Sequence, residues 1–162
     1  MTRNMIYVES METKFNKKRV AEITGLTERQ VQLYTEQGLI EPEVDPGTGR
    51  GRRRLYSQDN LFQFGIVREF VGYGMPIGKL RFVFKLLETR TLYRECQKII
   101  ENDPDLQVFV KVFYSDIFDK FSVEYTSLRD LDILLKVSEM KHITNCFVIN
   151  LREIYLSLKK HL

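Results

Sequence analysis

The feature that most constrains the fold is a pair of short helical patterns separated by a glycine. The first pattern begins at Asn16, a residue that caps helix N-termini well, and it ends at Gly25. The second begins at Thr27, and Gln30 three positions later completes a capping box. Gly38 stands where a left-handed residue ends the second helix. Two short helices joined by a tight turn that contains glycine predict a helix-turn-helix.

A small hairpin and two more helices are expected next. Residues 39–42 leave the second helix in an extended conformation, residues 45–49 form a turn, and residues 52–56 return as the second strand. Ser57 caps a third helix, and Pro76 is placed as the first residue of a fourth. The predicted order of this half is therefore helix, helix, hairpin, helix, helix.

Beyond residue 90 the patterns predict a small α/β region. The expected order is a short helix, a strand, a helix, a strand and a terminal helix, at residues 91–102, 106–114, 128–138, 144–150 and 151–162. Residues 128–138 also fit a strand, and the helix is preferred. Three acidic residues before them, Asp116, Asp119 and Glu124, are assigned to a loop.

The predicted fold is therefore mainly α: an N-terminal helix-turn-helix with a hairpin, a short linker helix and a small α/β C-terminal domain. The expected boundaries are a flexible N-terminal tail over 1–14, a helix-turn-helix unit over 15–89, a short linker helix over 90–103, and a small α/β domain over 104–162.

Charge is distributed unevenly over the 162 residues. The net charge is +3, but residues 1–90 carry 15 Lys and Arg against 11 Asp and Glu, whereas residues 91–162 carry 10 against 11. The segment 49–54 holds four arginines and no acidic residue. This asymmetry points to an N-terminal region that meets a polyanion, with a solvated charged loop as the alternative.

Three stretches carry a family resemblance: residues 20–31, residues 34–40 and the segment Arg53–Ser57, with a helix after a glycine-rich break following them. In this order they resemble the MerR family of bacterial transcription regulators. The resemblance implies a winged helix-turn-helix DNA-binding domain over 15–89, in a homodimer that binds an inverted-repeat promoter element. The second helix would lie in the major groove, the hairpin would form the wing, and the duplex would be distorted. The helix over 90–103 would then be a linker or dimerisation helix, and residues 104–162 a dimerisation or effector domain. The resemblance also implies RNA polymerase as a partner and a cytoplasmic, nucleoid-associated location.

The candidate DNA-binding residues are Lys17, Lys18, Arg29, Gln30, Gln32, Tyr34, Arg50, Arg52, Arg53, Arg54 and Tyr56. Arg and Gln form two-bond contacts with guanine and adenine, so those of the second helix are assigned to bases, with a solvated helix face as the alternative. The wing arginines are assigned to phosphates or the minor groove.

Three of these assignments have an open alternative. Tyr34 either reaches the DNA backbone or packs in the core, and Tyr56 either touches DNA or packs on the third helix. Lys17 and Lys18 lie unfavourably against the dipole of the first helix, which suggests a nearby phosphate or a tolerated surface cluster.

Two features depart from the family pattern. Gln32 and Leu33 replace an Arg-Tyr pair that family members commonly carry, which changes the expected operator and not DNA binding itself. The linker helix is too short for an extended coiled coil, so the dimer contact is either a small patch on it or a surface of the C-terminal domain.

Other chemistries have little support in the sequence. It has no phosphate-binding loop, metalloprotease helix or nucleophile elbow, so no enzyme activity and no catalytic residue are expected. Two distant cysteines predict no metal site and no cofactor, and no apolar run is long enough for a membrane span. Six aromatic residues either line a pocket for an apolar small-molecule effector or belong to the core: Phe109, Phe113, Tyr114, Phe118, Phe121 and Tyr125.

Two alternatives to a regulator are kept. One is a MerR-like protein-interaction module of the chaperone-modulator kind, and the other is an architectural DNA-binding protein of low specificity. The arginines of segment 49–54 favour DNA over the first alternative, because an interaction module has little use for a cationic wing without anions.

Overall fold

The computed structural model describes residues 14–47, 53–87, 92–115, 120–128 and 145–162. The elements in chain order are α1 (Lys17–Thr24), α2 (Glu28–Glu36), α3 (Gln58–Gly72), α4 (Ile77–Leu87), α5 (Leu92–Asn102), β1 (Gln107–Ser115), β2 (Lys120–Leu128), β3 (Asn145–Asn150) and α7 (Leu151–Lys159). The mainly α fold class with a small sheet is confirmed.

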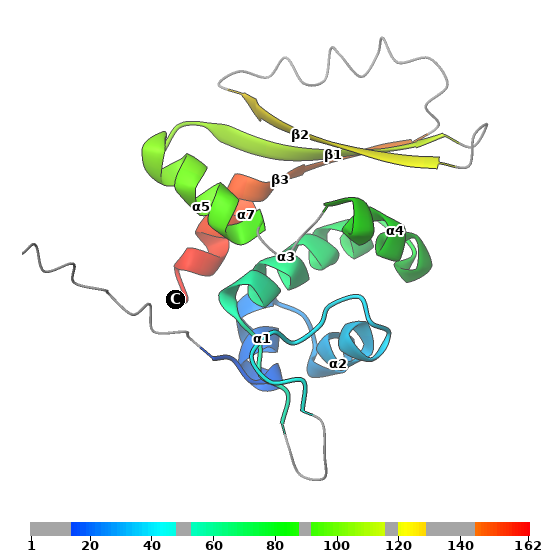
Figure 1. The fold of residues 1–162 in the computed structure, drawn as a ribbon, viewed down its shortest axis with the longest axis vertical. Coiled ribbons are helices and arrows are strands. Elements are labelled where there is room, and N and C mark those ends of the chain that lie inside the picture. The colour runs from blue at the N-terminus through cyan, green and yellow to red at the C-terminus, as the bar shows by residue number, and fades with distance from the viewer. Residues whose placement is uncertain (1–13, 48–52, 88–91, 116–119, 129–144) are drawn as a thin grey trace, which may run out of the picture.

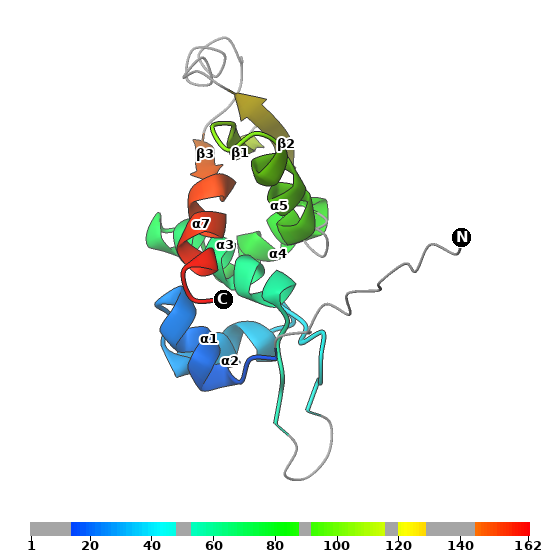
Figure 2. The same cartoon turned by 90° about the vertical axis from the view of Figure 1, so that its left-hand side faces the viewer.

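The molecule has two ends that are joined by α3. At one end α1 packs against both α2 and α3, and at the other end a three-stranded sheet lies over α3, α4 and α7 (Figure 1). Helices α5 and α7 stand side by side below the sheet (Figure 2). The chain ends beside α1, where Arg19 Nη2 donates a hydrogen bond of 3.3 Å to the His161 carbonyl.

Helix α3 is buried on almost all sides, which is unusual for a helix of a small protein. Every residue from Asp59 to Val67 is buried, and most of them are apolar. Gly65 makes this packing close: a Cβ added there would lie 2.6 Å from Ile154 Cγ2 of α7. The core is one continuous cluster that runs from α1 to α7.

The sheet corrects the expected order of C-terminal elements. Its strands are all antiparallel in the order β2-β1-β3. Of the acidic residues assigned to a loop, Glu124 lies in β2, where its backbone is paired in register with Lys111 of β1, and Asp116 and Asp119 lie outside the described residues. Leu128 ends β2 and does not begin a helix. The rest of the helix expected at 128–138 lies outside the described residues.

The other element ends are close to those predicted. Helix α4 begins at Ile77, one residue later than expected, because Pro76 stays outside it and its carbonyl accepts hydrogen bonds from Lys79 N and Leu80 N. Helix α7 ends at Lys159 and does not continue to the last residue. The strands at 106–114 and 144–150 are confirmed within one residue at each end.

Candidate nucleic-acid interface

The helix-turn-helix forms through the caps that its sequence predicts. The Asn16 side chain accepts a hydrogen bond from Arg19 N at 2.9 Å, and Gly25 ends α1 with a φ of +73°. The Thr27 backbone N–H donates to Gln30 Oε1 at 2.8 Å, and Gln30 N donates to Thr27 Oγ1 at 3.2 Å. These bonds satisfy donors that a free helix start leaves unpaired, and they set the angle at which α2 leaves the turn.

The turn is braced from α3 by a residue that the sequence did not single out. Arg68 Nη1 donates to the Thr24 carbonyl at 2.9 Å, so the end of α1 is tied to the central helix. Asn60 does the same for the segment after α2: its Nδ2 donates to the Glu41 carbonyl at 2.9 Å, and its Oδ1 accepts from Glu43 N at 3.0 Å. The pattern Ser57-x-x-Asn60 is a capping box and is the sequence signal for the second contact.

The described part of the hairpin is held by isolated bridges and contains no strand. Asp45 pairs with Leu55, and Tyr56 pairs with Phe15 from the segment before α1. The strand predicted over 52–56 is therefore wrong for the residues that the structure describes. The main reason is that Tyr56 takes its backbone partner from the N-terminal segment and not from the other arm of the hairpin.

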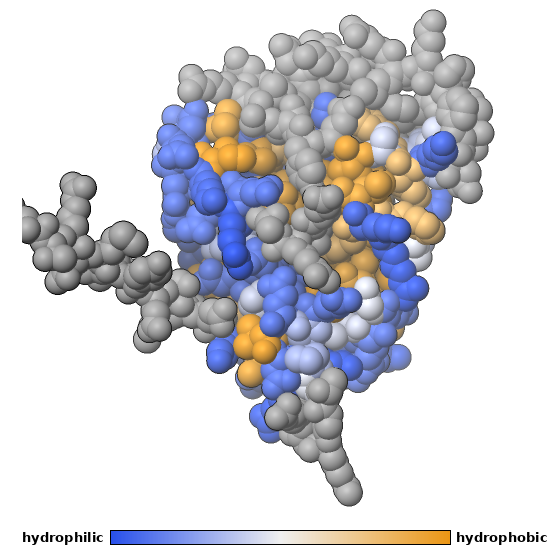
Figure 3. All heavy atoms as spheres, in the orientation of Figure 1, coloured by the Kyte–Doolittle hydropathy of each residue, from blue (hydrophilic) through white to orange (hydrophobic). Residues whose placement is uncertain are grey.

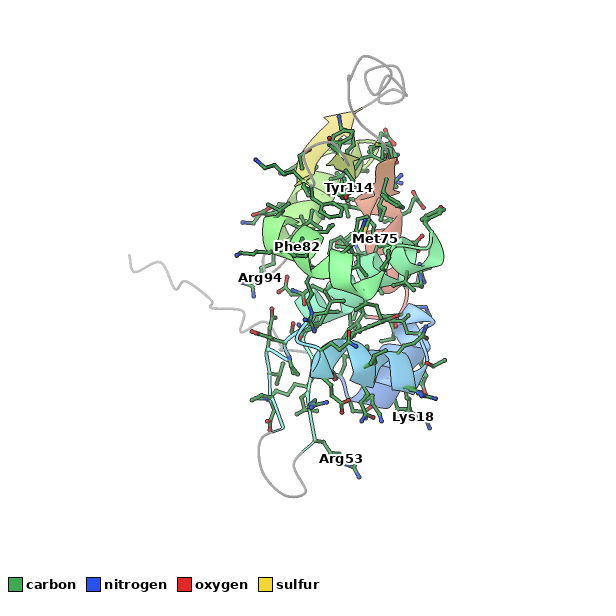
Figure 4. The ribbon with its side chains drawn as sticks, turned by 90° about the vertical axis from the view of Figure 1, so that its right-hand side faces the viewer. Lys18, Arg53, Met75, Phe82, Arg94 and Tyr114 are labelled. Atoms are coloured by element: carbon green, nitrogen blue, oxygen red, sulfur yellow. The ribbon has the colours of Figure 1, made fainter. Side chains whose placement is uncertain are left out.

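Cations from separate segments meet beside α2. A surface groove of about 560 Å³ runs between the start of α1, α2 and the returning arm of the hairpin, lined by Asn16, Lys17, Lys18, Glu28, Gln32, Gly47, Arg53, Arg54 and Tyr56. Lys18 and Arg53 are exposed and lie at the same end of the molecule (Figure 4). Arg29 and Gln32 are exposed on α2 itself and line an adjoining hollow with Lys17.

Two carboxylates of α2 pair with these cations. Lys17 Nζ lies 3.6 Å from Glu28 Oε2, and Arg54 Nη1 lies 3.8 Å from Glu36 Oε1. Gln32 links both pairs, because it accepts from Lys17 Nζ at 3.3 Å and donates to Glu36 Oε1 at 2.8 Å. Exposed pairs of this kind contribute about 0–1 kcal/mol, so a phosphate can replace the carboxylate at little cost.

Three of the predicted site residues already have partners within the chain. Gln30 Oε1 accepts from both polar hydrogens of Thr27, so this side chain serves the cap. Tyr34 is buried on the inner face of α2, and burial raises the pKa of its hydroxyl while a hydrogen bond with Gln30 lowers it. Packing is the role that the geometry gives to Tyr34.

Tyr56 is buried as well. Its ring meets Phe64 of α3 edge-on at 5.4 Å, and its hydroxyl shares a hydrogen bond of 3.0 Å with Thr35 Oγ1. Burial is the main cause of the raised pKa of this hydroxyl. Arg50 and Arg52 lie outside the described residues.

The described part of the chain offers little to a metal. No three His, Cys, Asp or Glu side chains of it stand close enough together to hold an ion. Burial raises the pKa of the Cys96 thiol to about 12, so this cysteine is not ionised at neutral pH. None of the described helices is both long and apolar enough to span a membrane.

Two capped helices joined by a tight turn, with an exposed polar second helix and a cationic arm beside it, place this chain among the helix-turn-helix proteins. A family model described as "MerR HTH family regulatory protein" matches residues 16–99, which is more than half of the chain. The chain belongs to the MerR HTH family of regulatory proteins.

The chain is also similar to curated proteins and to a solved structure. "Uncharacterized HTH-type transcriptional regulator" proteins of Mycobacterium bovis and of two Mycobacterium tuberculosis strains are 28% identical over 69 residues, which is 43% of this chain and 31% of each relative. The chain thus matches about a third of the length of these relatives. A crystal structure of a MerR-family transcriptional regulator from Bacillus cereus aligns over 56% of this chain and 74% of its own, with 19% identity and a TM-score of 0.37.

Proposed function

We propose that this chain is a transcriptional regulator that binds an inverted-repeat promoter element as a homodimer. One observation carries the proposal: cations from three separate segments, around Lys17, Arg29 and Arg53, gather on one surface around the exposed side of α2. A DNA duplex complements this surface, because it has a row of phosphates on either side of a groove that is wide enough for a helix.

The roles follow from exposure and from existing partners. Arg29 and Gln32 are the base-reading candidates, because both are exposed on α2. Lys17, Lys18, Arg53 and Arg54 bind phosphates, together with Arg50 and Arg52 by their place in the sequence. Gln30 supports α2 through its N-terminal cap, and Tyr34 and Tyr56 support it from the core. These three residues affect DNA binding only through the position of α2.

The dimer is proposed to form through a surface other than the linker helix. The apolar side of α5, formed by Leu92, Tyr93, Cys96 and Ile100, is buried against α3 and α7 of the same chain. It is therefore not free to pair with α5 of a second copy, and the C-terminal domain is the remaining candidate for the dimer contact. The regulator would act without catalysis on the cytoplasmic nucleoid, in contact with RNA polymerase, and an effector is left open.

Selection on random duplex DNA tests this function. We expect one enriched sequence made of two inverted half-sites whose centres are a whole number of helical turns apart, since a symmetric dimer presents two copies of α2. An enriched site without a repeat would overturn the dimer. Enrichment of no particular sequence would favour the architectural alternative, and absence of duplex binding would favour the interaction module.

A further inference from the structure

Helix α4 keeps a pair of large apolar side chains outside the core. Phe82 is 63% exposed and Leu86 is 48% exposed, whereas the other side of the helix is buried through Leu80, Val83, Phe84 and Leu87. Phe82 and Leu86 are four positions apart, so they are neighbours on one stripe of the helix. Apolar colour bordered by hydrophilic colour covers the part of the surface where α4 lies (Figure 3).

Cations surround this pair. Lys79, Arg81 and Lys85 are exposed on the same helix, and α4 contains no acidic residue. Arg81 and Lys85 are themselves four apart and form a second stripe beside the apolar one. Lys79 Nζ stands 4.1 Å from the centre of the Tyr114 ring, so this cation is already engaged. A surface that complements α4 must be both apolar and anionic.

We propose that the outer face of α4, formed by Arg81, Phe82, Lys85 and Leu86, docks an acidic amphipathic segment of a partner protein. Apolar side chains of that segment cover Phe82 and Leu86, and its carboxylates pair with Arg81 and Lys85. An amphipathic helix with apolar anchors at positions i and i+4 and acidic residues beside them has the required pattern.

Other occupants match this face less well. A second copy of the same face would bring cations against cations, which is unfavourable at an interface. Duplex DNA would neutralise Arg81 and Lys85 but leave Phe82 and Leu86 in water. Phe82 also lies away from the end of the molecule that carries Lys18 and Arg53 (Figure 4).

The position of α4 connects this face to the helix-turn-helix. Arg81 Nη2 donates a hydrogen bond of 2.5 Å to the Gln37 carbonyl, at the C-terminal end of α2. A partner that takes the Arg81 side chain therefore competes with a contact that holds the end of α2. The docking proposal itself does not depend on DNA binding.

Selection of peptides from a random display library tests the proposal. The target is the full chain, and the counter-target is the double variant Phe82→Ser/Leu86→Ser. We expect recovered peptides to combine apolar residues at i, i+4 spacing with an excess of Asp and Glu. Synthetic copies should bind in fluorescence anisotropy, at least about tenfold more weakly to the double variant, as is usual when apolar anchors at an interface are removed.

Two further variants separate docking from a folding defect. Lys85→Glu should weaken the acidic peptides, and peptides with one Glu changed to Lys should recover affinity for this variant. Tyr73→Ser removes a 69% exposed ring from the α3–α4 turn and should leave peptide binding unchanged. Thermal unfolding of each variant verifies that it is folded.

Several results would overturn the proposal. Peptides that are not acidic, or that bind the double variant equally well, would show that α4 is not the docking face. Conversion of a dimer to a monomer by Phe82→Ser/Leu86→Ser would make the face a contact between copies. If Lys85→Ala reduced the salt dependence of duplex binding as much as Arg53→Ala does, the outer face of α4 would be a DNA contact.

Discussion

Glu36 is an anion on the surface assigned to DNA. Its carboxylate lies 3.8 Å from Arg54 and accepts a hydrogen bond from Gln32. On the proposed interface this carboxylate would compete with phosphate for Arg54 and would repel the duplex. Glu36→Gln should therefore tighten duplex binding several-fold at low salt, measured by fluorescence anisotropy. The gain corresponds to about one additional phosphate contact, with the release of about one counterion.

Glu101 provides a matched control for this change. It accepts a hydrogen bond from Gln97 at 2.9 Å, in the same i, i+4 arrangement as Gln32 and Glu36, but it lies on α5. Glu101→Gln should leave affinity nearly unchanged. Equal gains from both substitutions would mean that only net charge matters, and no gain from Glu36→Gln would place α2 away from the phosphates.

A substitution at Tyr56 tests whether this residue supports the fold or contacts DNA. Tyr56→Phe keeps the ring against Phe64 and removes only the hydrogen bond to Thr35. We expect the free energy of unfolding in urea to fall by about 1 kcal/mol and duplex affinity to change less than twofold. A large loss of affinity at unchanged stability would mean that the hydroxyl binds DNA.

Asp59 predicts a pH dependence of stability. Burial, followed by the nearby Glu43, raises its pKa, while Arg94 at 3.3 Å lowers it. Its Oδ1 is buried with no hydrogen-bond partner among the described residues. The pKa of Asp59 is higher in the folded chain than in the unfolded chain, so the folded chain binds this proton first as the pH falls. Its protonation therefore increases the free energy of unfolding on acidification.

Asp59→Asn removes this titration. The stability of the variant relative to the native chain should be highest at about neutral pH and should decrease towards pH about 4, where the unfolded carboxyl also binds its proton. Urea unfolding across this range measures the difference. If the variant instead became more stable relative to the native chain on acidification, the pKa of Asp59 in the folded chain would be lowered and not raised.

At the scale of elements, two glycines in helices predict opposite effects. Gly65→Ala places a Cβ 2.6 Å from Ile154, between α3 and α7, and should destabilise the chain by about 1–3 kcal/mol. Gly78 in α4 has no atom within 4 Å of an added Cβ, so Gly78→Ala should stabilise by up to about 1 kcal/mol. Thermal unfolding measures both, and equal effects would contradict the close α3–α7 packing.

The elements of the N-terminal half could be predicted because their signals are local. Caps at Asn16, Thr27 and Ser57 fix where three helices begin, and these depend on residues only three positions apart. Strand β2 was missed although Phe121 and Val123 alternate with Ser122 and Glu124. Glu124 was interpreted as part of a loop, whereas its backbone is in register with Lys111 across the sheet.

The role of α5 could not be predicted, because an apolar helix face does not specify its partner. Cys96 and Ile100 fit a dimer seam and a core equally well in sequence, and only the packing of α3 and α7 decides between them. The same holds for Tyr34 and Tyr56, whose spacing fitted both DNA contact and core.

At the scale of the whole molecule, α3 connects the two ends. It contacts α1 below and α5 and α7 above, and Arg68 on it holds the Thr24 carbonyl at the end of α1. The cationic surface was predictable as a set of residues, since charge is visible in sequence. Its pairing with Glu28 and Glu36 was not, because that depends on how the arm returns beside α2.

The central claim is that α2 and the arm carrying Arg53 bind duplex DNA, and the salt dependence of affinity tests it most directly. The logarithm of the binding constant should fall linearly with the logarithm of salt concentration, with a slope of about −0.9 per phosphate contacted. Arg53→Ala should reduce that slope by about one unit, while Lys98→Ala on α5 leaves it unchanged. Absence of duplex binding at low salt, or equal slopes for both variants, would contradict the claim.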